Sequence, residues 1–526
     1  MIRIRQIKIE VDKDNIDLLK KKVISKLKIN ESDIKNFKIN KKSIDARKKD
    51  LIYYVYEVDL EIINEDKILK NTKSNDIIKI ENEEYKIDIC GNKKLNNRIV
   101  IVGSGPAGLF CAYALASLGY KPLIIERGEK IEDRVKTVEK LFNEGILNPN
   151  SNVQFGEGGA GTFSDGKLNT LVKDKFNRCK KVYEIFVENG APEEILYLNK
   201  PHIGTDVLRN VIINMRNKII SMGGEFRYNT TLTNLVINEE KLEKIEVNNN
   251  ELIDCEVLVL AIGHSARDTF KMLYENNLVM SPKPFAVGIR IMHTQEMINQ
   301  NQYGTKYKLP PADYKLTYNT KEKRGVYSFC MCPGGYVVNA SSEEKFLAIN
   351  GMSNHKRDSV TSNSAIVVTV NPNDYGNSIF DGIKFQRMLE EKAYNLGKGK
   401  IPVQLYGDYK NNKISTGFRK VKPIIKGMYT FANINEIFPE FINESIKEAI
   451  EYYDTKIKGF SRSDAIVAGV ESRTSSPIRI ERDENFNSSV LGIYPIGEGA
   501  GYAGGITTSA IDGLKVSEEI ARIYEC

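Results

Sequence analysis

Apolar and polar residues alternate near the start of the chain in a way that predicts a small α+β unit. The run IRIRQIKIEV, residues 2–11, has the period of two that is typical of a half-buried strand. The next apolar residues recur at helical spacing, at Ile16, Leu19, Val23 and Leu27, which predicts a helix. A second long strand is predicted by the alternation of Ile52, Tyr54, Tyr56, Val58, Leu60 and Ile62. We expect this unit to span residues 1–90, and the polar stretch CGNKKLNN, residues 90–97, to be a linker.

From residue 98 onward the pattern becomes one of alternating strands and helices. Residues 98–128 have the form strand, glycine turn, helix, strand, and a helix and a glycine-rich loop follow over 129–175. Residues 176–225 are predicted to be mostly helical, and 226–262 to form short strands. This succession is typical of a parallel sheet with helical crossovers, so a Rossmann-like nucleotide-binding domain is predicted here.

Between residues 280 and 460 the pattern changes again, to short strands joined by loops with one helical stretch. After it the chain returns to strand and helix, in GIYPIGEGAG and ITTSAIDGLKVSEEIARIY. We therefore expect a nucleotide domain in two parts, 97–280 and 461–526, with a mixed β-rich substrate domain inserted at 281–460. The predicted fold class is α/β combined with α+β.

Composition adds the expectation of a globular, cytoplasmic protein. With 41% hydrophobic and 28% charged residues, the composition is that of a globular protein. The length of 526 residues predicts two or three domains. The net charge of +7 does not by itself indicate a nucleic acid or a membrane as partner. Seven cysteines, sparse and mostly isolated, favour a reducing compartment over a disulfide framework. The start lacks the apolar core of a signal peptide, and no run approaches the ~20 apolar residues of a membrane span.

A glycine motif at the start of the nucleotide domain predicts a dinucleotide site. A short apolar strand is followed by Gly103, Gly105 and Gly108, a spacing that permits a tight turn, close approach of a pyrophosphate and close helix packing. The N-terminus of the next helix presents free N–H groups to a phosphate. Glu126, 23 residues after Gly103, ends the second strand, where an acid accepts hydrogen bonds from a ribose and disfavours a 2′-phosphate. NAD or FAD is therefore predicted here rather than NADP.

A second glycine turn near the C-terminus decides between these two cofactors. In IYPIGEGAGYAGGI a strand delivers Gly497 and Glu498 to a glycine-rich turn, and a long helix begins just after it. Too little chain follows for another complete dinucleotide fold, so this segment is expected to complete the first one. FAD extends well beyond its pyrophosphate, with a ribityl chain that Glu498 could bind and a flavin that the helix N-terminus could stabilise. NAD would leave the second turn unexplained, so FAD is predicted.

These residues resemble the FAD-dependent oxidoreductases of the glutathione reductase-like superfamily, in which an acid, usually Asp, takes the place of Glu498. LVLAIGHSARDT, residues 258–269, is similar to a second cofactor motif there, with Ala261 and Gly263 matching. More narrowly, VQFGEGGAGTFSDGKL, KKSIDARKK, YSFCMCPGG, VESRTSSPIRI and PIGEGAGYAGGI together resemble a bacterial family of FAD-dependent dehydrogenases with an N-terminal ferredoxin-like domain. What that family does to which substrate is not implied by the resemblance.

By analogy with related flavoproteins, the glycine-rich loop from Gly156 to Ser164 is expected to lie against the flavin or its phosphates, and Arg134 to reach a phosphate. The predicted cofactor-binding residues are Gly103, Gly105, Pro106, Ala107, Gly108, Glu126, Arg127, Arg134, Gly158, Gly159, Gly161, Thr162, Ser164, Ala261, Gly263, Gly497, Glu498, Gly504, Gly505 and Ile506.

The flavin itself carries hydride at N5, so the protein need only position the substrate and supply protons or charge. No motif identifies a catalytic base. His264, Cys330, Cys332 and Arg473 are candidates for chemistry, although a histidine bonded inside the fold, small buried thiols and arginines paired with nearby acids would explain them equally well. Arg473 and Arg479 could instead hold a carboxylate or phosphate. Asp165 and Arg267 are further candidates. A metal site is not expected, since none of the four histidines has a recognisable ligand spacing.

The sequence therefore predicts a cytoplasmic FAD-dependent oxidoreductase that transfers hydride to or from an unidentified small molecule, with a transient NAD(P)H as one possible reductant. Two alternatives stay open. The basic stretch Lys35–Lys49 in the N-terminal domain would suit a flavin-dependent enzyme that modifies RNA. A flavin-binding redox sensor or scaffold without turnover is the other.

Overall fold

The computed structural model describes residues 1–71, 74–81, 84–170, 172 and 174–526. Its N-terminal unit contains β1 (Ile2–Glu10), α1 (Ile16–Leu27), β2 (Ile34–Asp45), β3 (Tyr53–Ile62), α2 (Glu65–Asn71) and β4 (Ile77–Lys79). The sheet is antiparallel in the order β2-β3-β1-β4. The apolar positions of the alternating strands and of α1 form one core, which includes Ile4, Val23 and Val58. The succession β-α-β-β-α-β is the one that the ferredoxin-like fold expected from the sequence would have, and that assignment stays a prediction.

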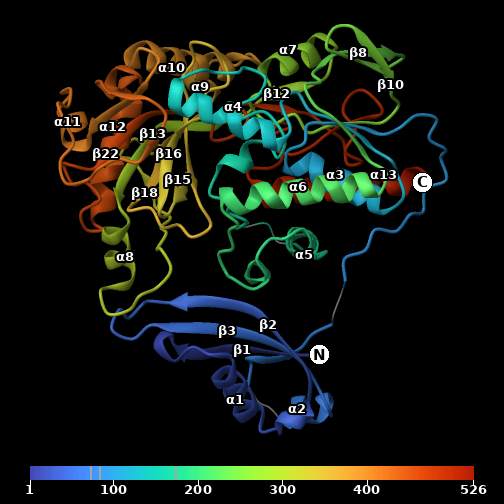
Figure 1. Ribbon diagram of the computed structural model, residues 1–526, viewed down its shortest axis with the longest axis vertical. Helices are drawn as coiled ribbons and strands as arrows, with labels where there is room; N and C mark the ends of the chain where they lie inside the picture. Colours follow the sequence, from blue (N-terminus) through green and yellow to red (C-terminus); the bar gives the residue numbers. More distant parts are fainter. Residues whose placement is uncertain (72–73, 82–83, 171, 173) are drawn as a thin grey trace.

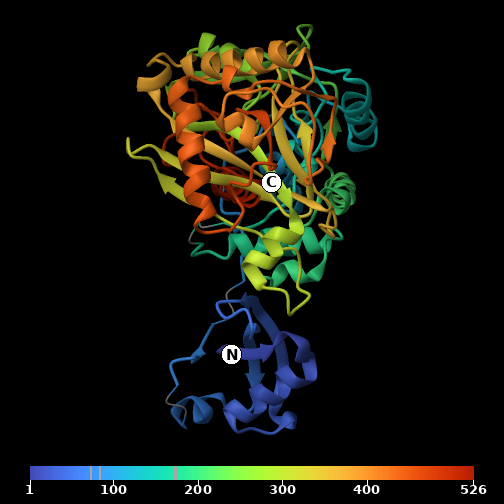
Figure 2. The same cartoon turned by 90° about the vertical axis from the view of Figure 1, so that its left-hand side faces the viewer.

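This unit lies at one end of the molecule in both ribbon views (Figures 1 and 2). It contacts the larger part through the backbone of Lys42, whose N–H donates to Tyr197 O over 2.7 Å and whose carbonyl accepts from Asn199 N over 2.9 Å. Part of the basic stretch is neutralised locally, because Lys42 pairs with Asp14 and Arg47 with Asp45.

The nucleotide sheet has five parallel strands in the order β24-β11-β5-β6-β7. They are β5 (Val100–Val102), β6 (Leu123–Ile125), β7 (Glu225–Arg227), β11 (Leu258–Leu260) and β24 (Ile493–Pro495). The apolar runs of β5, β6, β11 and β24 are buried because both faces of the sheet are covered. β24 comes from the C-terminal segment and lies beside β11, so the two predicted parts of the nucleotide unit form one sheet.

Helices cover one face of this sheet, and a small sheet covers the other. The helical side has α3 (Pro106–Ser117), α5 (Arg178–Glu188), α6 (Thr205–Ser221) and α13 (Ile506–Ile523), which share one apolar core. Figure 1 shows α13 beside α3. Their contact requires Gly513, where a Cβ would lie 2.3 Å from Ala107 O. The other side has α7 (Arg267–Glu275) and the sheet of β8 (Leu232–Asn238), β9 (Lys241–Val247) and β10 (Glu251–Asp254).

The β-rich part is built on seven strands in the order β14-β15-β18-β13-β22-β19-β21. They are β13 (Phe285–Thr294), β14 (Thr317–Asn319), β15 (Gly325–Cys332), β18 (Thr361–Val370), β19 (Ile401–Leu405), β21 (Tyr429–Phe431) and β22 (Ile466–Glu471). Long central strands such as β13 and β18 are buried along their length, between α10 (Asp381–Gly397), α12 (Glu440–Asp454) and the remaining structure. β22 belongs to this sheet although it lies beyond residue 460, where we had placed the end of the insertion.

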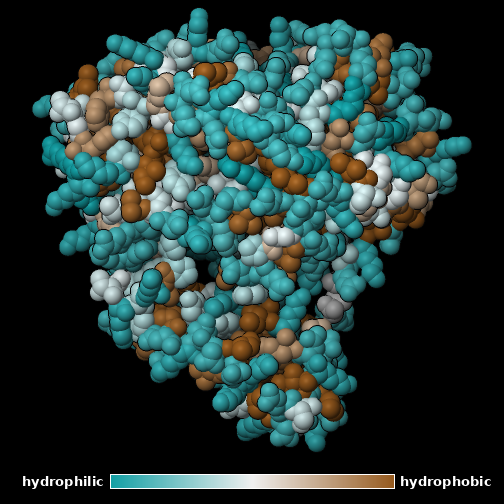
Figure 3. Space-filling view, in the orientation of Figure 1, coloured by the Kyte–Doolittle hydropathy of each residue, from teal (hydrophilic) through white to brown (hydrophobic). Residues whose placement is uncertain are grey.

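The remaining elements connect these layers. A three-stranded sheet contains β16 (Gly335–Asn339), β17 (Ile349–Ser353) and β20 (Ile425–Lys426), and a two-stranded ladder joins β12 (Met280–Pro282) to β23 (Ile478–Ile480). The other helices are α4 (Ile131–Glu144), α8 (Gln295–Tyr303), α9 (Pro372–Tyr375) and α11 (Tyr406–Lys410). Figure 3 shows hydrophilic residues over most of one face of the molecule. Within the described part of the chain, no helix combines the length and apolarity needed to cross a bilayer.

Candidate functional site

A cavity of about 490 Å³ lies between the carboxyl ends of the parallel strands and the seven-stranded sheet. Its volume is in the range of small-molecule and cofactor sites. Segments distant in sequence meet in its wall, including the turns after β5, β11 and β24. The predicted residues that line it are Gly103, Gly105, Pro106, Ala107, Glu126, Arg127, Gly159, Gly161, Ser164, Ala261, Gly263, Glu498, Gly504, Gly505 and Ile506, with His264, Cys330, Cys332 and Arg473. Gly108, Arg134, Gly158, Thr162 and Gly497 lie behind this wall.

The first glycine turn is shaped for a ligand that approaches its backbone. Gly103 has φ +98°, and a Cβ there would lie 2.4 Å from Ala261 O. Gly108 packs so closely that its Cβ would meet Gly103 O at 1.9 Å. Gly105 differs, since its Cβ would meet only Gly159 Cα, at 3.7 Å. Gly105 also begins α3 without a side-chain cap, so the first N–H groups of this helix are free for an anion in the cavity.

Glu126 binds the glycine turn to the glycine-rich loop. Its Oε2 accepts from the N–H and Oγ of Ser104, over 2.9 and 2.8 Å. Its Oε1 accepts from the N–H groups of Gly128 and Gly156, over 2.9 and 3.0 Å. Two donors on each oxygen use the usual capacity of a carboxylate. The ribose contact predicted for Glu126 stays a prediction, and it requires one of these oxygens to be shared.

Arg134 supports the glycine-rich loop from behind and is not placed to reach a phosphate in the cavity. Its guanidinium is fully buried and donates to the carbonyls of Asn152, Val153, Gly156, Glu157 and Gly159. The predicted phosphate contact is therefore wrong, because the guanidinium donors are used by the backbone. Arg127 does line the cavity, and its guanidinium lies over the ring of Phe155 and donates to Asp268.

The second glycine turn provides another helix N-terminus. Gly505 has φ +153° and begins α13 without a side-chain cap. Added Cβ atoms at Gly263, Gly504 and Gly505 would meet no protein atom within 4 Å, so this wall is open to a ligand. The Nδ1 of His264 lies 3.4 Å from Oε1 of Glu498, whereas its Nε2 is buried and has no hydrogen-bond partner among the described residues.

These features fit FAD better than a shorter ligand. Two uncapped helix N-termini suit its phosphates and the polar side of its flavin, and the glycine walls leave room for an elongated molecule. The unpartnered Nε2 of His264 offers a hydrogen bond to a ligand group at the flavin end. FAD would thus lie along the cavity between the two glycine turns.

Cys330 projects into the same cavity from a bulge in β15. The residue has φ +41°, and the strand register shifts between Phe329 and Cys332. The bulge is held by the buried Arg290, which donates to Cys330 O over 3.1 Å and pairs with Glu471. The thiol of Cys330 is accessible from the cavity, whereas Cys332 is buried. Although Cys330 is exposed to the cavity, the protein around it desolvates its thiol and raises the pKa to about 12, against the opposing effect of Arg290.

The raised pKa predicts a steep pH dependence of alkylation. Because the thiolate is the reactive form, the rate at which iodoacetamide modifies Cys330 should rise about tenfold per pH unit from pH 7 to 10. Peptide mass spectrometry over this range would measure it, with the buried Cys332 as the internal control. If the alkylation rate reached a plateau below pH 9, the pKa of the Cys330 thiol would be lower than the raised value expected here.

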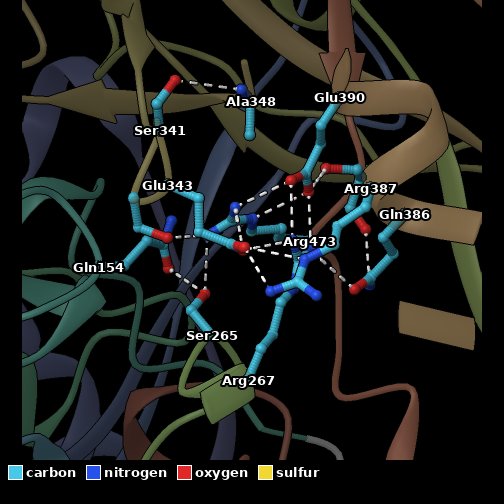
Figure 4. A network of polar contacts seen from close by, with 12 residues as sticks. Gln154, Ser265, Arg267, Ser341, Glu343, Ala348, Gln386, Arg387, Glu390 and Arg473 are labelled. Carbon is cyan, nitrogen blue, oxygen red and sulfur yellow. Dashed lines mark hydrogen bonds and ion pairs between the residues drawn. The ribbon is translucent and has the colours of Figure 1, made fainter. Parts of the chain in front are cut away.

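A buried charge network borders the cavity at Arg473 (Figure 4). Glu390 on α10 lies between two guanidinium groups, with its carboxylate 2.9 Å from Arg267 and 2.9 Å from Arg473. Burial raises the pKa of the Glu390 carboxyl, but the two arginines outweigh it and hold this pKa well below its usual range. Arg473 also donates to the Oγ atoms of Ser265 and Ser342. Its pairing with Glu390 argues against the free anion-binding role considered for it.

Several cavity residues were missed by reasoning from the sequence. Gln154 and Ser265, which share a hydrogen bond of 3.2 Å, line the cavity together with Lys167, Ser328 and Asn350. Gln154, Ser265, Lys167 and Ser328 each lie within one of the motifs quoted above, so membership of those motifs was the available signal. Asp165 also lines the cavity, where it is paired with Arg357.

Three family models match the chain. Residues 284–474 match "FAD-dependent protein, C-terminal domain-like", residues 101–148 match an NAD(P)-binding Rossmann-like domain, and residues 1–61 match a domain of unknown function. An uncharacterized protein of Clostridium beijerinckii is 48% identical over 532 residues, which cover 100% of this chain and 99% of that protein.

Solved enzyme structures also match the chain, at low similarity. The flavin-dependent brominase Bmp2 is 14% identical, with 81% of this chain and 79% of that chain covered and a TM-score of 0.37. L-proline dehydrogenase from P. horikoshii is 11% identical, with 81% and 94% covered and a TM-score of 0.34. The halogenase PltM in complex with phloroglucinol and FAD is 9% identical, with 81% and 68% covered and a TM-score of 0.36. Similarity of this degree does not specify a reaction.

Proposed function

Since this chain belongs to the family of FAD-dependent proteins, we propose that it is an oxidoreductase that transfers hydride to or from a small-molecule substrate. Its cofactor is FAD. When bound, FAD supplies hydride transfer at N5. The chain must therefore bind the cofactor, exclude water from it and position a substrate beside it.

The two glycine turns are assigned to the cofactor. The N–H groups at the start of α3 would bind the pyrophosphate, while those at the start of α13 and the Nε2 of His264 would face the flavin end. Glu498 orients the His264 ring through Nδ1. The buried Nε2 that lacks a partner among the described residues, inside a cavity built from both turns, is the observation that carries this proposal.

The remaining wall of the cavity is assigned to the substrate. Ser328, Cys330 and Asn350 line the cavity from strands of the β-rich part, and Lys167, from the loop after Ser164, lines it too and donates to Met331 O. These groups supply one cation and several hydrogen-bonding atoms, which suits a polar small molecule. A raised thiol pKa makes Cys330 a neutral group at pH 7, so a thiolate nucleophile is not part of the proposal.

Anaerobic spectroscopy tests the proposed function. The purified flavoprotein should be bleached by a two-electron donor and regain its oxidised spectrum when a suitable acceptor from a metabolite panel is added. Turnover with any donor and acceptor pair supports an oxidoreductase. If no pair turns over, but flavin reduction changes the affinity for a protein or RNA partner, a redox sensor is the better description.

A further inference from the structure

The ladder of β12 and β23 has one apolar face and one charged face. Its pairing places Met280 opposite Ile480 and Ser281 opposite Arg479. Its apolar face contributes Met280, Ile478 and Ile480 to the core on the side of the nucleotide sheet that carries α7 and β8–β10. Because side chains alternate along a strand, Arg479 and Ser281 lie on the opposite face, and Lys283 follows two residues after Ser281.

Lys283 and Arg479 are two half-buried cations without an ionic partner in the described part of the chain. Neither side chain has a hydrogen bond or ion pair with a described residue, and the Nε of Arg479 is buried without any acceptor there. Burial lowers the pKa of Lys283, and the neighbouring Arg479 lowers it further, against a smaller opposing effect of Glu498. Burying an unpaired donor costs stability, so this arrangement indicates an anion that is bound from outside.

The other charged side chains nearby already have hydrogen-bond or ion-pair partners. Arg482 pairs with Asp512 over 2.7 Å. Glu481 accepts a hydrogen bond from Ser281 Oγ, and Glu498 contacts His264. The two acids on this side therefore have partners other than Lys283 and Arg479, which stay available to an incoming anion.

An exposed aromatic ring adjoins these cations. The Tyr502 ring has the Arg482 guanidinium 3.8 Å and the Arg479 guanidinium 5.1 Å from its centroid. Tyr502 is 36% exposed. It belongs to the turn that joins Glu498 to Gly504 and Gly505, and all three of those residues line the cofactor cavity. A ligand bound at Tyr502 would thus be next to the flavin end.

We propose that Lys283 and Arg479 bind a phosphoryl group of a reduced nicotinamide nucleotide, which stacks on Tyr502 and serves as the electron donor. This inference rests on the proposed function, because it names the donor for that site. Phosphate matches a pair of neighbouring cations, and the adenine base matches the partly exposed ring of Tyr502, which leaves the nicotinamide to reach the flavin. A phosphorylated substrate without a base would match the two cations but not the aromatic ring.

Calorimetric titration of the FAD-loaded protein tests this site directly. NADH, NADPH and inorganic pyrophosphate would each be titrated into the unmodified protein and into Lys283→Met, Arg479→Met and Tyr502→Ala. Lys271→Met and Arg419→Met remove equal charges from positions elsewhere on the surface and serve as controls. FAD content and melting temperature of each variant report whether the fold is retained.

We expect Kd for at least one nucleotide to rise about tenfold in each cation variant, because a charge-assisted hydrogen bond is lost. Tyr502→Ala should weaken the nucleotide and leave pyrophosphate unchanged. Unaltered Kd values in the cation variants, or the absence of nucleotide binding, would overturn the proposal. If only pyrophosphate binds, the ligand is another phosphorylated molecule and the nucleotide assignment is wrong. Turnover with a different donor would leave the oxidoreductase assignment intact in each of these cases.

Discussion

Replacing Glu390 by glutamine is expected to lower the free energy of unfolding by about 3–5 kcal/mol, because it leaves buried guanidinium groups without their counter-charge. The Glu390 carboxylate is fully buried, and the side chains of Arg267 and Arg473 are 3% and 4% exposed. Glutamine retains the shape but cannot balance either cation. Glu343 contacts Arg267 as well, so part of the compensation remains in the variant.

Urea unfolding of the apoprotein at pH 7 would measure this loss. Glu391→Gln, at the exposed next position of α10, removes the same charge and is expected to change stability by less than about 0.5 kcal/mol. Equal effects of the two substitutions would show that the buried network does not stabilise the fold.

The same network should make the stability difference between the unmodified protein and Glu390→Gln depend on pH. The folded pKa of Glu390 is lowered, whereas an unfolded glutamate titrates near its usual value of about 4.3. Stability from its ionised form is therefore present above that value and is lost as the pH falls toward the folded pKa. The difference should be largest near pH 7 and shrink below about pH 4.

Gly105→Ala is expected to weaken FAD binding by about 10- to 100-fold, which corresponds to ~1.4–2.7 kcal/mol. The backbone at Gly105 has φ −73°, which alanine adopts without strain. The added methyl group would meet only Gly159 Cα at ordinary contact distance, so the apoprotein can accommodate it. It would occupy space at the start of α3, where the pyrophosphate needs close access to the backbone.

Flavin fluorescence quenching would measure the affinity, and thermal unfolding of the apoprotein would check the fold. We expect the free energy of apoprotein unfolding to change by less than about 1 kcal/mol. Gly417→Ala is the matched control, because an added Cβ there would meet no protein atom within 4 Å and the residue lies outside the cavity. Undiminished FAD affinity of Gly105→Ala would place the pyrophosphate elsewhere.

The parts of the fold that follow local patterns could be predicted from the sequence. The glycine spacing after β5 and the second glycine turn before α13 each have a physical reason that is visible in a short stretch. Their meeting could also be predicted, because FAD is long enough to call for a second glycine turn beyond its pyrophosphate site. The FAD-dependent family was predicted from these motifs and is confirmed by the comparisons.

Pairings between distant polar residues could not be predicted in this way. Glu390 occupies a helix whose sequence does not distinguish it from the exposed Glu391, and its two partners lie 123 and 83 residues away. Arg134 was assigned to a phosphate by analogy with related flavoproteins, but loop carbonyls use its donors. β22 was placed outside the insertion because its short apolar run gives no indication of which sheet it joins.

Hydrogen exchange with and without FAD tests most directly whether two distant segments bind one cofactor molecule. Adding FAD to the apoprotein should slow exchange at both helix starts, in residues 105–108 and 505–508, with one midpoint and a stoichiometry of one FAD per chain. Gly105→Ala should shift both responses together. Protection of only one segment, or two separate midpoints, would contradict a single cofactor held between them.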